Sequence, residues 1–152
     1  MTQRRIVDSP LGPLTLEAQD GALTALRLGA CGVPEGEDSA LLLETQAQLE
    51  AYFAGSDAPF SLPLHPAGTA FQLAVWRALT RVPHGQTRTY AWLAETAGRP
   101  GACRAAGTAA GKNPLPILIP CHRILRADGG LGGFSLGLHV KQYLLELEHG
   151  RK

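Results

Sequence analysis

A cysteine set between a proline and a basic pair carries the strongest chemical signal in the sequence. Cys121 follows Pro120 and an apolar run at residues 115–119, and His122 and Arg123 come directly after it. A thiolate is a strong nucleophile, and a neighbouring base or cation lowers the pKa of a thiol. An arbitrary buried cysteine is more often a small apolar side chain. The adjacent base and cation favour a reactive thiol at the edge of the core.

The histidine beside this thiol is a candidate general base. Consecutive side chains of an extended chain point to opposite sides, so we expect His122 to reach the sulfur of Cys121 through a water molecule. A carboxylate would then orient the imidazole ring. Four acidic residues follow residue 68, and the choice among them stays open at this point. They are Glu95, Asp128, Glu146 and Glu148.

A short helix predicted over residues 101–110 is the second candidate functional element. At 100° per residue, one side of it carries only alanines: Ala102, Ala105, Ala106 and Ala109. The opposite side carries Arg104, Gly107, Thr108 and Gly111. A helix with so bare an outer face can lie close against a phosphate backbone. The alternative is an alanine-rich helix that only packs tightly inside a small protein.

The elements expected before this helix complete a helix-turn-helix. Thr69 and Gln72 fit a capping box, followed by an apolar stripe that ends at the turn of residues 83–85. Thr89 can cap the next helix, which the turn at residues 98–100 separates from the Arg104 helix.

The elements expected after it present and support the thiol. The apolar run at residues 115–119 is predicted to be a buried strand or extended segment that ends at Pro120. A glycine-rich loop at residues 127–133 could close over a flat ligand. A closing helix carries Val140, Leu144 and Leu147 on one side.

The N-terminal third is predicted to be a small antiparallel sheet with a helix. The expected strands are residues 5–7, 14–18 and 22–28, the expected helix is 39–54, and the expected linker is 56–68. We therefore predict an α+β protein with an N-terminal domain at residues 1–60 and a C-terminal domain at residues 69–152.

Composition narrows the class of protein. The chain has 152 residues, 45% of them hydrophobic, and three cysteines that form no CxxC pair, so a disulfide scaffold is not expected. We expect a soluble cytoplasmic protein that does not enter membranes. Residues 1–68 carry three basic and nine acidic residues, and residues 69–152 carry eleven basic and four acidic ones. This asymmetry indicates that the C-terminal part faces a polyanion.

Several segments together resemble a known family. They are IPCHR with NP seven residues before its cysteine, TYAWLAETAGRPGACRAAG, GGLGGFSLGLHVKQYLLELE and, more loosely, SPLGPLTLEAQDGALTALRLG. The chain closely resembles the O6-alkylguanine-DNA alkyltransferases. The resemblance implies an RNase H-like N-terminal domain and a C-terminal domain with a helix-turn-helix and an active-site cysteine loop.

The same resemblance implies an activity. It is the stoichiometric, self-inactivating transfer of an alkyl group from O6-alkylguanine, or O4-alkylthymine, to Cys121 after base flipping. The expected partner is alkylated double-stranded DNA and the expected state is a monomer. No cofactor is expected, and no metal site is predicted.

The resemblance also assigns roles to individual residues. Cys121 would accept the alkyl group, His122 would act as base through water, Glu148 would orient His122, and Asn113 would tie the Arg104 helix to the cysteine loop. The expected substrate-binding residues are Tyr90, Pro116, Ile124, Phe134 and Ser135. The expected DNA-binding residues are Arg104, which would fill the gap left by the flipped nucleotide, Thr89, Gly107, Thr108 and Arg123. Phe134 stands where the family usually has tyrosine, which keeps ring stacking but removes a hydroxyl.

Two other classes of function are compatible with the same residues. A cysteine hydrolase would need an oxyanion hole and repeated turnover. A non-catalytic helix-turn-helix or lesion-binding protein would need no acceptor, whereas Cys121 is present. A zinc site made by Cys31, Cys103 and Cys121 fits no known ligand spacing.

Overall fold

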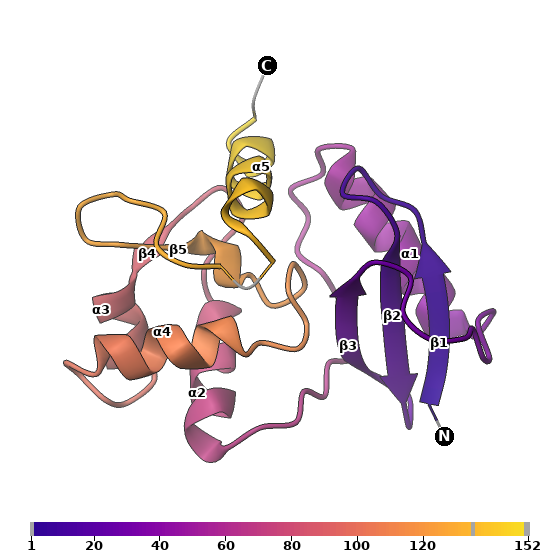
Figure 1. Ribbon diagram of the computed structural model, residues 1–152, viewed down its shortest axis with the longest axis horizontal. Helices are drawn as coiled ribbons and strands as arrows, with labels where there is room; N and C mark the ends of the chain where they lie inside the picture. Colours follow the sequence, from indigo (N-terminus) through magenta and orange to yellow (C-terminus); the bar gives the residue numbers. More distant parts are fainter. Residues whose placement is uncertain (1, 135, 151–152) are drawn as a thin grey trace. The chain divides into compact units, whose positions relative to one another are not determined.

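Three short strands and one helix build the N-terminal part of the chain. The strands are β1 (Thr2–Val7), β2 (Leu14–Gln19) and β3 (Ala22–Leu28), and they form an antiparallel sheet in that order. The computed structural model describes residues 2–134 and 136–150 and divides into two units, residues 1–67 and 68–152 (Figure 1). Asp20 and Gly21, with φ of 52° and 80°, form the predicted hairpin turn. The α+β class is confirmed.

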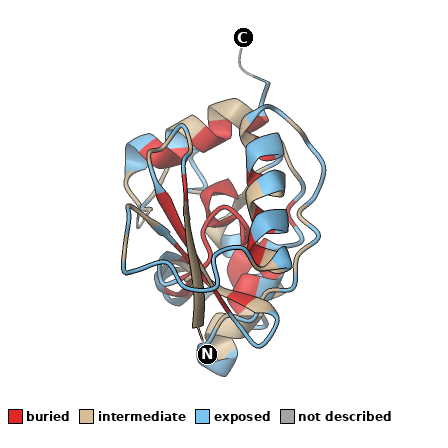
Figure 2. Ribbon diagram, turned by 90° about the vertical axis from the view of Figure 1, so that its right-hand side faces the viewer, coloured by how far each residue is buried: buried red, intermediate tan, exposed pale blue. Residues whose placement is uncertain are grey.

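Helix α1 (Ala40–Phe53) packs its buried side on this sheet. Ser39 caps the helix by accepting a hydrogen bond from the Leu42 backbone N–H at 3.2 Å. The helix contacts β1 and β2, and its exposed residues, pale blue in Figure 2, alternate with buried ones at helical spacing. The buried ones are Leu42, Thr45, Leu49 and Tyr52.

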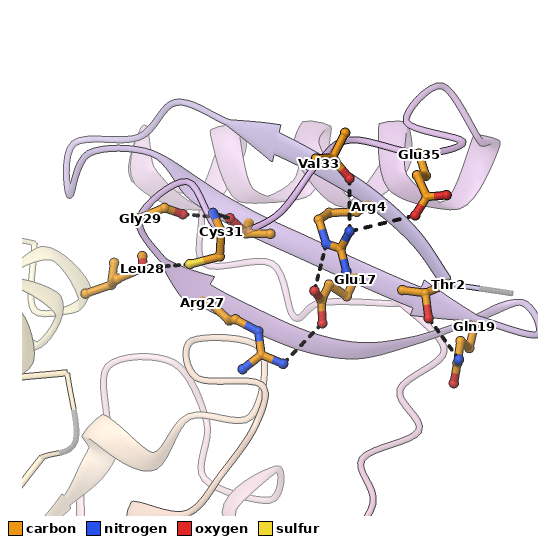
Figure 3. A network of polar contacts seen from close by, with 11 residues as sticks. Thr2, Arg4, Glu17, Gln19, Arg27, Leu28, Gly29, Cys31, Val33 and Glu35 are labelled. Carbon is orange, nitrogen blue, oxygen red and sulfur yellow. Dashed lines mark hydrogen bonds and ion pairs between the residues drawn. The ribbon is translucent and has the colours of Figure 1, made fainter.

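Arginines from β1 and β3 form ion pairs with Glu17 of the central strand β2 (Figure 3). Arg4 donates to Glu17 at 2.8 Å and to the Val33 carbonyl at 2.9 Å, and Arg27 donates to Glu17 at 3.2 Å. The Cys31 sulfur lies 3.7 Å from the Leu28 carbonyl oxygen in the same region. Arg4 and Arg27 are therefore paired within the N-terminal unit.

The first unit runs further than residue 60. The Leu23 N–H donates to the Pro63 carbonyl, and the His65 N–H donates to the Leu23 carbonyl, both at 2.8 Å. The segment predicted as a linker is therefore partly paired with β3, and the unit ends at residue 67.

The second unit is mainly helical. Its elements are α2 (Ala70–Leu79), β4 (Arg88–Thr89), α3 (Tyr90–Thr96), α4 (Cys103–Gly111), the 3-10 helix η1 (Cys121–Arg123), β5 (Ile124–Leu125) and α5 (Leu138–Glu148). The predicted capping box is present, because Thr69 and Gln72 exchange side-chain and backbone hydrogen bonds. Thr89 caps α3 by accepting from the Trp92 N–H.

The helix-turn-helix of α3 and α4 packs on α2. Trp76 of α2 donates from its indole N–H to the Ala109 carbonyl at 2.9 Å. Ala106, Ala109 and Ala110 are the buried residues of α4. The prediction that Ala105 faces inward is wrong: it is exposed, and Ala110 is buried instead. Helix α4 presents residues 104, 107, 108 and 111 away from its buried side, as predicted.

The run at residues 115–119 is a turn and not an extended segment. Ile117 has φ of 74°, and the Ile119 N–H donates back to the Leu115 carbonyl at 2.8 Å. Apolar composition predicted burial correctly, since Leu115, Ile117 and Ile119 are buried. The turn depends on hydrogen bonds made by the side chain of Asn113, which lies outside the run.

Candidate active site

Asn113 shapes the turn that leads to the cysteine. Its side chain accepts from the Leu115 N–H at 2.9 Å and donates to the Ile119 carbonyl at 2.8 Å. The residue follows the end of α4, so these bonds connect α4 to the cysteine segment. Pro120 then leads into η1, which begins with Cys121.

Cys121 is 5% exposed and lies at the wall of a cavity. Because residues 121–123 form a 3-10 turn, the expectation of an extended chain at His122 is wrong. The turn sends His122 and Arg123 inward, where both meet the last residue of α5.

Glu148 is the carboxylate that holds His122. The Nε2 atom of His122 lies 2.6 Å from Oε2 of Glu148, and both side chains are buried. A carboxylate accepts, so Nε2 carries the proton, and Nδ1 of a neutral ring keeps its lone pair. This Nδ1 atom is buried and has no hydrogen-bond partner among the described residues. The imidazole is therefore set up to take a proton at Nδ1.

The prediction that Arg123 contacts DNA is contradicted by its position. Its side chain is 10% exposed and donates to both Glu148 oxygens, at 2.8 and 2.9 Å. Its remaining nitrogen donates to the Val82 carbonyl at 2.7 Å. Arg123 is thus a buried structural cation that fixes the carboxylate.

Arg123 also does not activate the thiol. Burial raises the pKa of Cys121 to about 11, while a hydrogen bond from Asn113 and the charge of Lys141 oppose that rise. The side chains that lower this pKa are those of Asn113 and Lys141 and not those of His122 or Arg123, contrary to the expectation. Burial likewise lowers the pKa of His122 against the opposing effect of Glu148, so the imidazole is neutral at pH 7.

Lys141 of α5 is a functional candidate that sequence reasoning missed. The residue is fully buried, and its ammonium donates to the carbonyl oxygens of Leu131 and Gly133. The nitrogen lies 5.8 Å from the ring centre of Tyr90. Burial lowers the pKa of Lys141 to about 8. Its place on the inner side of α5 could have been found by spacing, since it is one residue after Val140 and seven before Glu148.

A cavity of about 580 Å³ extends from the sulfur of Cys121. Its lining comes from α3, α4, η1 and the loop after β5: Tyr90, Cys103, Arg104, Gly107, Thr108, Ala110, Gly111, Cys121, Arg126, Gly132, Gly133 and Phe134. The volume is within the range of small-ligand pockets. The helix predicted to face a phosphate backbone and the predicted nucleophile thus share one cavity.

Some predicted residues lie elsewhere. Pro116 is buried in the turn and Ile124 is buried in β5, and neither lines the cavity. Thr89 is occupied as the cap of α3. Ser135 lies outside the described residues. Cys103 and Arg126 line the cavity without having been predicted to do so, whereas Gly132 and Gly133 belong to the glycine-rich loop that was expected to close over a ligand.

Two glycines leave room for the side chain of Tyr90, which lines the cavity. A Cβ atom at Gly132 would lie 2.7 Å from the hydroxyl of Tyr90, and one at Gly107 would lie 3.4 Å from its ring. Tyr90 therefore stands between two residues that have no side chain. Its pKa is raised by burial and by the nearby Cys121, against a Gly133 backbone hydrogen bond, so the phenol keeps its proton.

The described residues suit group transfer to sulfur better than metal chemistry. A thiol, a neutral base and a fixed carboxylate are together, whereas residues 2–134 and 136–150 contain no group of three metal-ligating side chains. In that same described part, no helix is long and apolar enough to cross a membrane.

Comparison with known proteins covers nearly the whole chain. Residues 4–66 match the family described as "6-O-methylguanine DNA methyltransferase, ribonuclease-like domain", and residues 70–150 match its "DNA binding domain". A methylated-DNA--protein-cysteine methyltransferase of Methanosarcina barkeri is 42% identical over 149 residues, which is 94% of each chain. The protein of that name in Mycobacterium tuberculosis is 42% identical over 99% of this chain and 94% of its own.

Solved structures agree with these matches. The crystal structure of the Mycobacterium tuberculosis O6-methylguanine methyltransferase superposes with a TM-score of 0.88 at 42% identity, covering 100% of this chain and 95% of that one. The structure of the Mycobacterium tuberculosis protein in complex with DNA gives 0.89 at 44% identity, covering 98% and 94%. Since both the sequence and the fold match over both units, the chain belongs to the 6-O-methylguanine-DNA methyltransferase family.

Proposed function

We propose that this protein repairs alkylated DNA directly, by moving the alkyl group from O6 of guanine to the sulfur of Cys121. One observation carries the proposal: a cavity of about 580 Å³ joins the buried thiol to the exposed side of α4. The names of the relatives, and the solved complex of one of them with DNA, support the same reaction.

Access to the thiol requires that the base leave the duplex. Cys121 is 5% exposed, so a base stacked inside DNA cannot reach it. Extrusion of one nucleotide costs a few kcal/mol and is easier where pairing is damaged. Arg104 is exposed and lines the cavity, so it can fill the gap in the duplex. Gly107 and Thr108, on the same side of α4, let the backbone approach closely.

Inside the cavity the flipped base would lie against aromatic rings. Tyr90 and Phe134 both line it, and stacking on aromatic faces tolerates any base. The protonated phenol of Tyr90 can donate a hydrogen bond to the base. Phe134 contributes only its ring.

The reaction forms one bond and breaks one. The sulfur of Cys121 attacks the alkyl carbon, the bond from that carbon to O6 breaks, and its electron pair leaves with guanine. The thiol proton passes through a bridging water to Nδ1 of His122. Guanine leaves as an anion and takes up one proton from solvent, and the imidazolium later returns its proton to solvent, so the number of protons is conserved. Glu148 stabilises the imidazolium that forms. The product is a thioether, which has no ready leaving group, so each molecule reacts once and needs no cofactor.

Lys141 would act as a positioning residue in this reaction. Its charge lowers the pKa of Cys121 and therefore favours the thiolate. Its hydrogen bonds to Leu131 and Gly133 hold the loop that lines the cavity. Lys141 therefore anchors this loop to α5, the helix that also carries Glu148.

The oligomeric state, the cellular location and the range of substrates are part of the same proposal. We expect a monomer that acts in the cytoplasm on double-stranded DNA, with O4-alkylthymine as a second substrate. Thr89 would contact DNA near the start of α3.

Intact-mass spectrometry after mixing with a duplex that contains O6-methylguanine tests the function. We expect one methyl group per protein, on Cys121, and none in Cys121→Ala. Glu148→Gln should slow the transfer by about 100-fold or more, because the base loses its orienting carboxylate. Circular dichroism of that variant checks that it folds. Turnover of many equivalents would support the hydrolase alternative, and tight binding without methyl transfer would support the non-catalytic one.

A further inference from the structure

Arg126 places a second guanidinium at the cavity that contains Arg104. The two cations come from different elements, since Arg104 is on α4 and Arg126 directly follows β5. Both line the cavity. The charge of Arg126 also reaches the hydroxyl of Tyr90 and opposes the rise of its pKa. Arg126 is therefore near Tyr90, one of the aromatic residues on which the flipped base would stack.

The backbone at Arg126 is fixed on both sides. Strand β5 pairs in parallel with β4, so Leu125 lies opposite Thr89, the cap of α3. The Arg126 N–H donates to the Gly130 carbonyl, and the Gly129 N–H donates to the Arg126 carbonyl, both at 2.9 Å. The side chain thus starts from a defined point beside the N-terminus of α3.

The side chain lies over a glycine and is held only loosely. A Cβ atom at Gly130 would be 3.1 Å from two nitrogens of the guanidinium, so a larger residue would displace it. The guanidinium forms an ion pair with Asp128 at 3.6 Å, and the two side chains are 62% and 69% exposed. Exposed pairs of this kind are weak. Asp128 also accepts from the Gly130 N–H at 2.8 Å, which keeps the carboxylate in place.

We propose that Arg126 binds the backbone phosphate next to the flipped nucleotide, and that in the free protein Asp128 occupies the place of that phosphate. The inference rests on the proposed function and adds a DNA-positioning residue to it. A guanidinium matches the geometry of phosphate through two parallel hydrogen bonds. Release of Asp128 leaves that carboxylate on its own turn, so the exchange requires little rearrangement.

Binding of a duplex with one O6-methylguanine, measured by fluorescence anisotropy across a series of NaCl concentrations, tests the exchange. Arg126→Gln should weaken binding several-fold and reduce the slope of log affinity against log salt by about one. Asp128→Asn should tighten binding in the wild-type background and have no effect in the Arg126→Gln background, because Asp128 acts through Arg126. Arg77→Gln is the matched control, since Arg77 is an exposed cation that does not line the cavity.

Three results would overturn the inference. They are an unchanged salt slope in Arg126→Gln, an equal loss in Arg77→Gln, and an additive effect of the two substitutions in the double variant. Methyl transfer on the same samples separates this inference from the function. If wild-type protein takes up no methyl, the proposed repair reaction fails while the salt slopes still decide the role of Arg126.

Discussion

The carboxylate of Glu148 serves a base and a permanent cation together. His122 and Arg123 are adjacent in the chain, and the 3-10 turn brings both to the same two oxygens. Arg123 offsets the charge of Glu148, so burial can keep the imidazole neutral. A neutral ring is what a base requires. Arg123, which was predicted to contact DNA, instead helps to keep the candidate base His122 neutral.

The thiol of Cys121 should react slowly with small reagents until the pH is high. Its pKa is raised to about 11, so at pH 8 about one molecule in a thousand carries the thiolate. We expect the rate of carboxamidomethylation by iodoacetamide to rise through pH 10 without levelling off, as measured by peptide mass spectrometry.

Lys141→Met should reduce that rate below about pH 8 and make little difference near pH 10, because the pKa of Lys141 is lowered to about 8 and only its charged form favours the thiolate. Lys112→Met, at an exposed position, is the control. A rate that levels off near pH 8, or equal rates in both variants, would contradict the assignment of Lys141 as counter-charge. Transfer from O6-methylguanine should fall in parallel, with Lys141→Arg recovering part of the loss.

Helix α4 and the loop after β5 form two sides of one cavity, and glycine is needed on the loop side. Gly132 has φ of 68°, a region that favours glycine, and it borders the hydroxyl of Tyr90. The next residue, Gly133, has open space at the position of a Cβ atom. Gly132 and Gly133 therefore provide a test position and its control, because an added methyl group meets Tyr90 only at Gly132.

Gly132→Ala should slow methyl transfer by about tenfold or more, whereas Gly133→Ala should stay within about twofold. The added methyl of the first variant meets Tyr90 at 2.7 Å and strains the backbone, which costs about 1–3 kcal/mol. Single-turnover rates, followed by intact mass, measure both. Equal rates in the two alanine variants would show that the cavity does not depend on this contact.

At the scale of the whole molecule, charge separates the two units. Residues 1–68 carry three basic and nine acidic residues, while residues 69–152 carry eleven basic and four acidic. In the N-terminal unit the arginines are held by partners such as Glu17. The sequence-independent attraction to phosphate therefore belongs to the C-terminal unit.

Hydrogen exchange should reveal this division. On addition of duplex DNA we expect protection in α3, α4 and the loop at residues 126–134, and none in β1, β2 and β3. Addition of about 1 M NaCl should remove the protection, because the Debye length then falls to about 3 Å. Protection of the N-terminal sheet comparable to that of α4 would contradict the division.

Local patterns determined most of the elements. The strands, the hairpin at Asp20 and Gly21, and the helix capped by Ser39 follow from short-range rules, and the structure confirms them. The capping box at Thr69 and the bare side of α4 were equally predictable. These features depend on neighbours within a few residues, which a sequence displays directly.

What only the tertiary structure decided involves contacts between distant residues. Arg123 and Glu148 are 25 positions apart, and Asn113 reverses an apolar run that by its composition resembled a strand. Lys141 is buried because its carbonyl partners come from another segment. The sequence by itself identified Cys121, His122 and the bare side of α4 as candidate functional groups. Whether each charged side chain turns inward or outward depended on which partners folding brought to it, since a buried charge requires a partner that local patterns do not reveal.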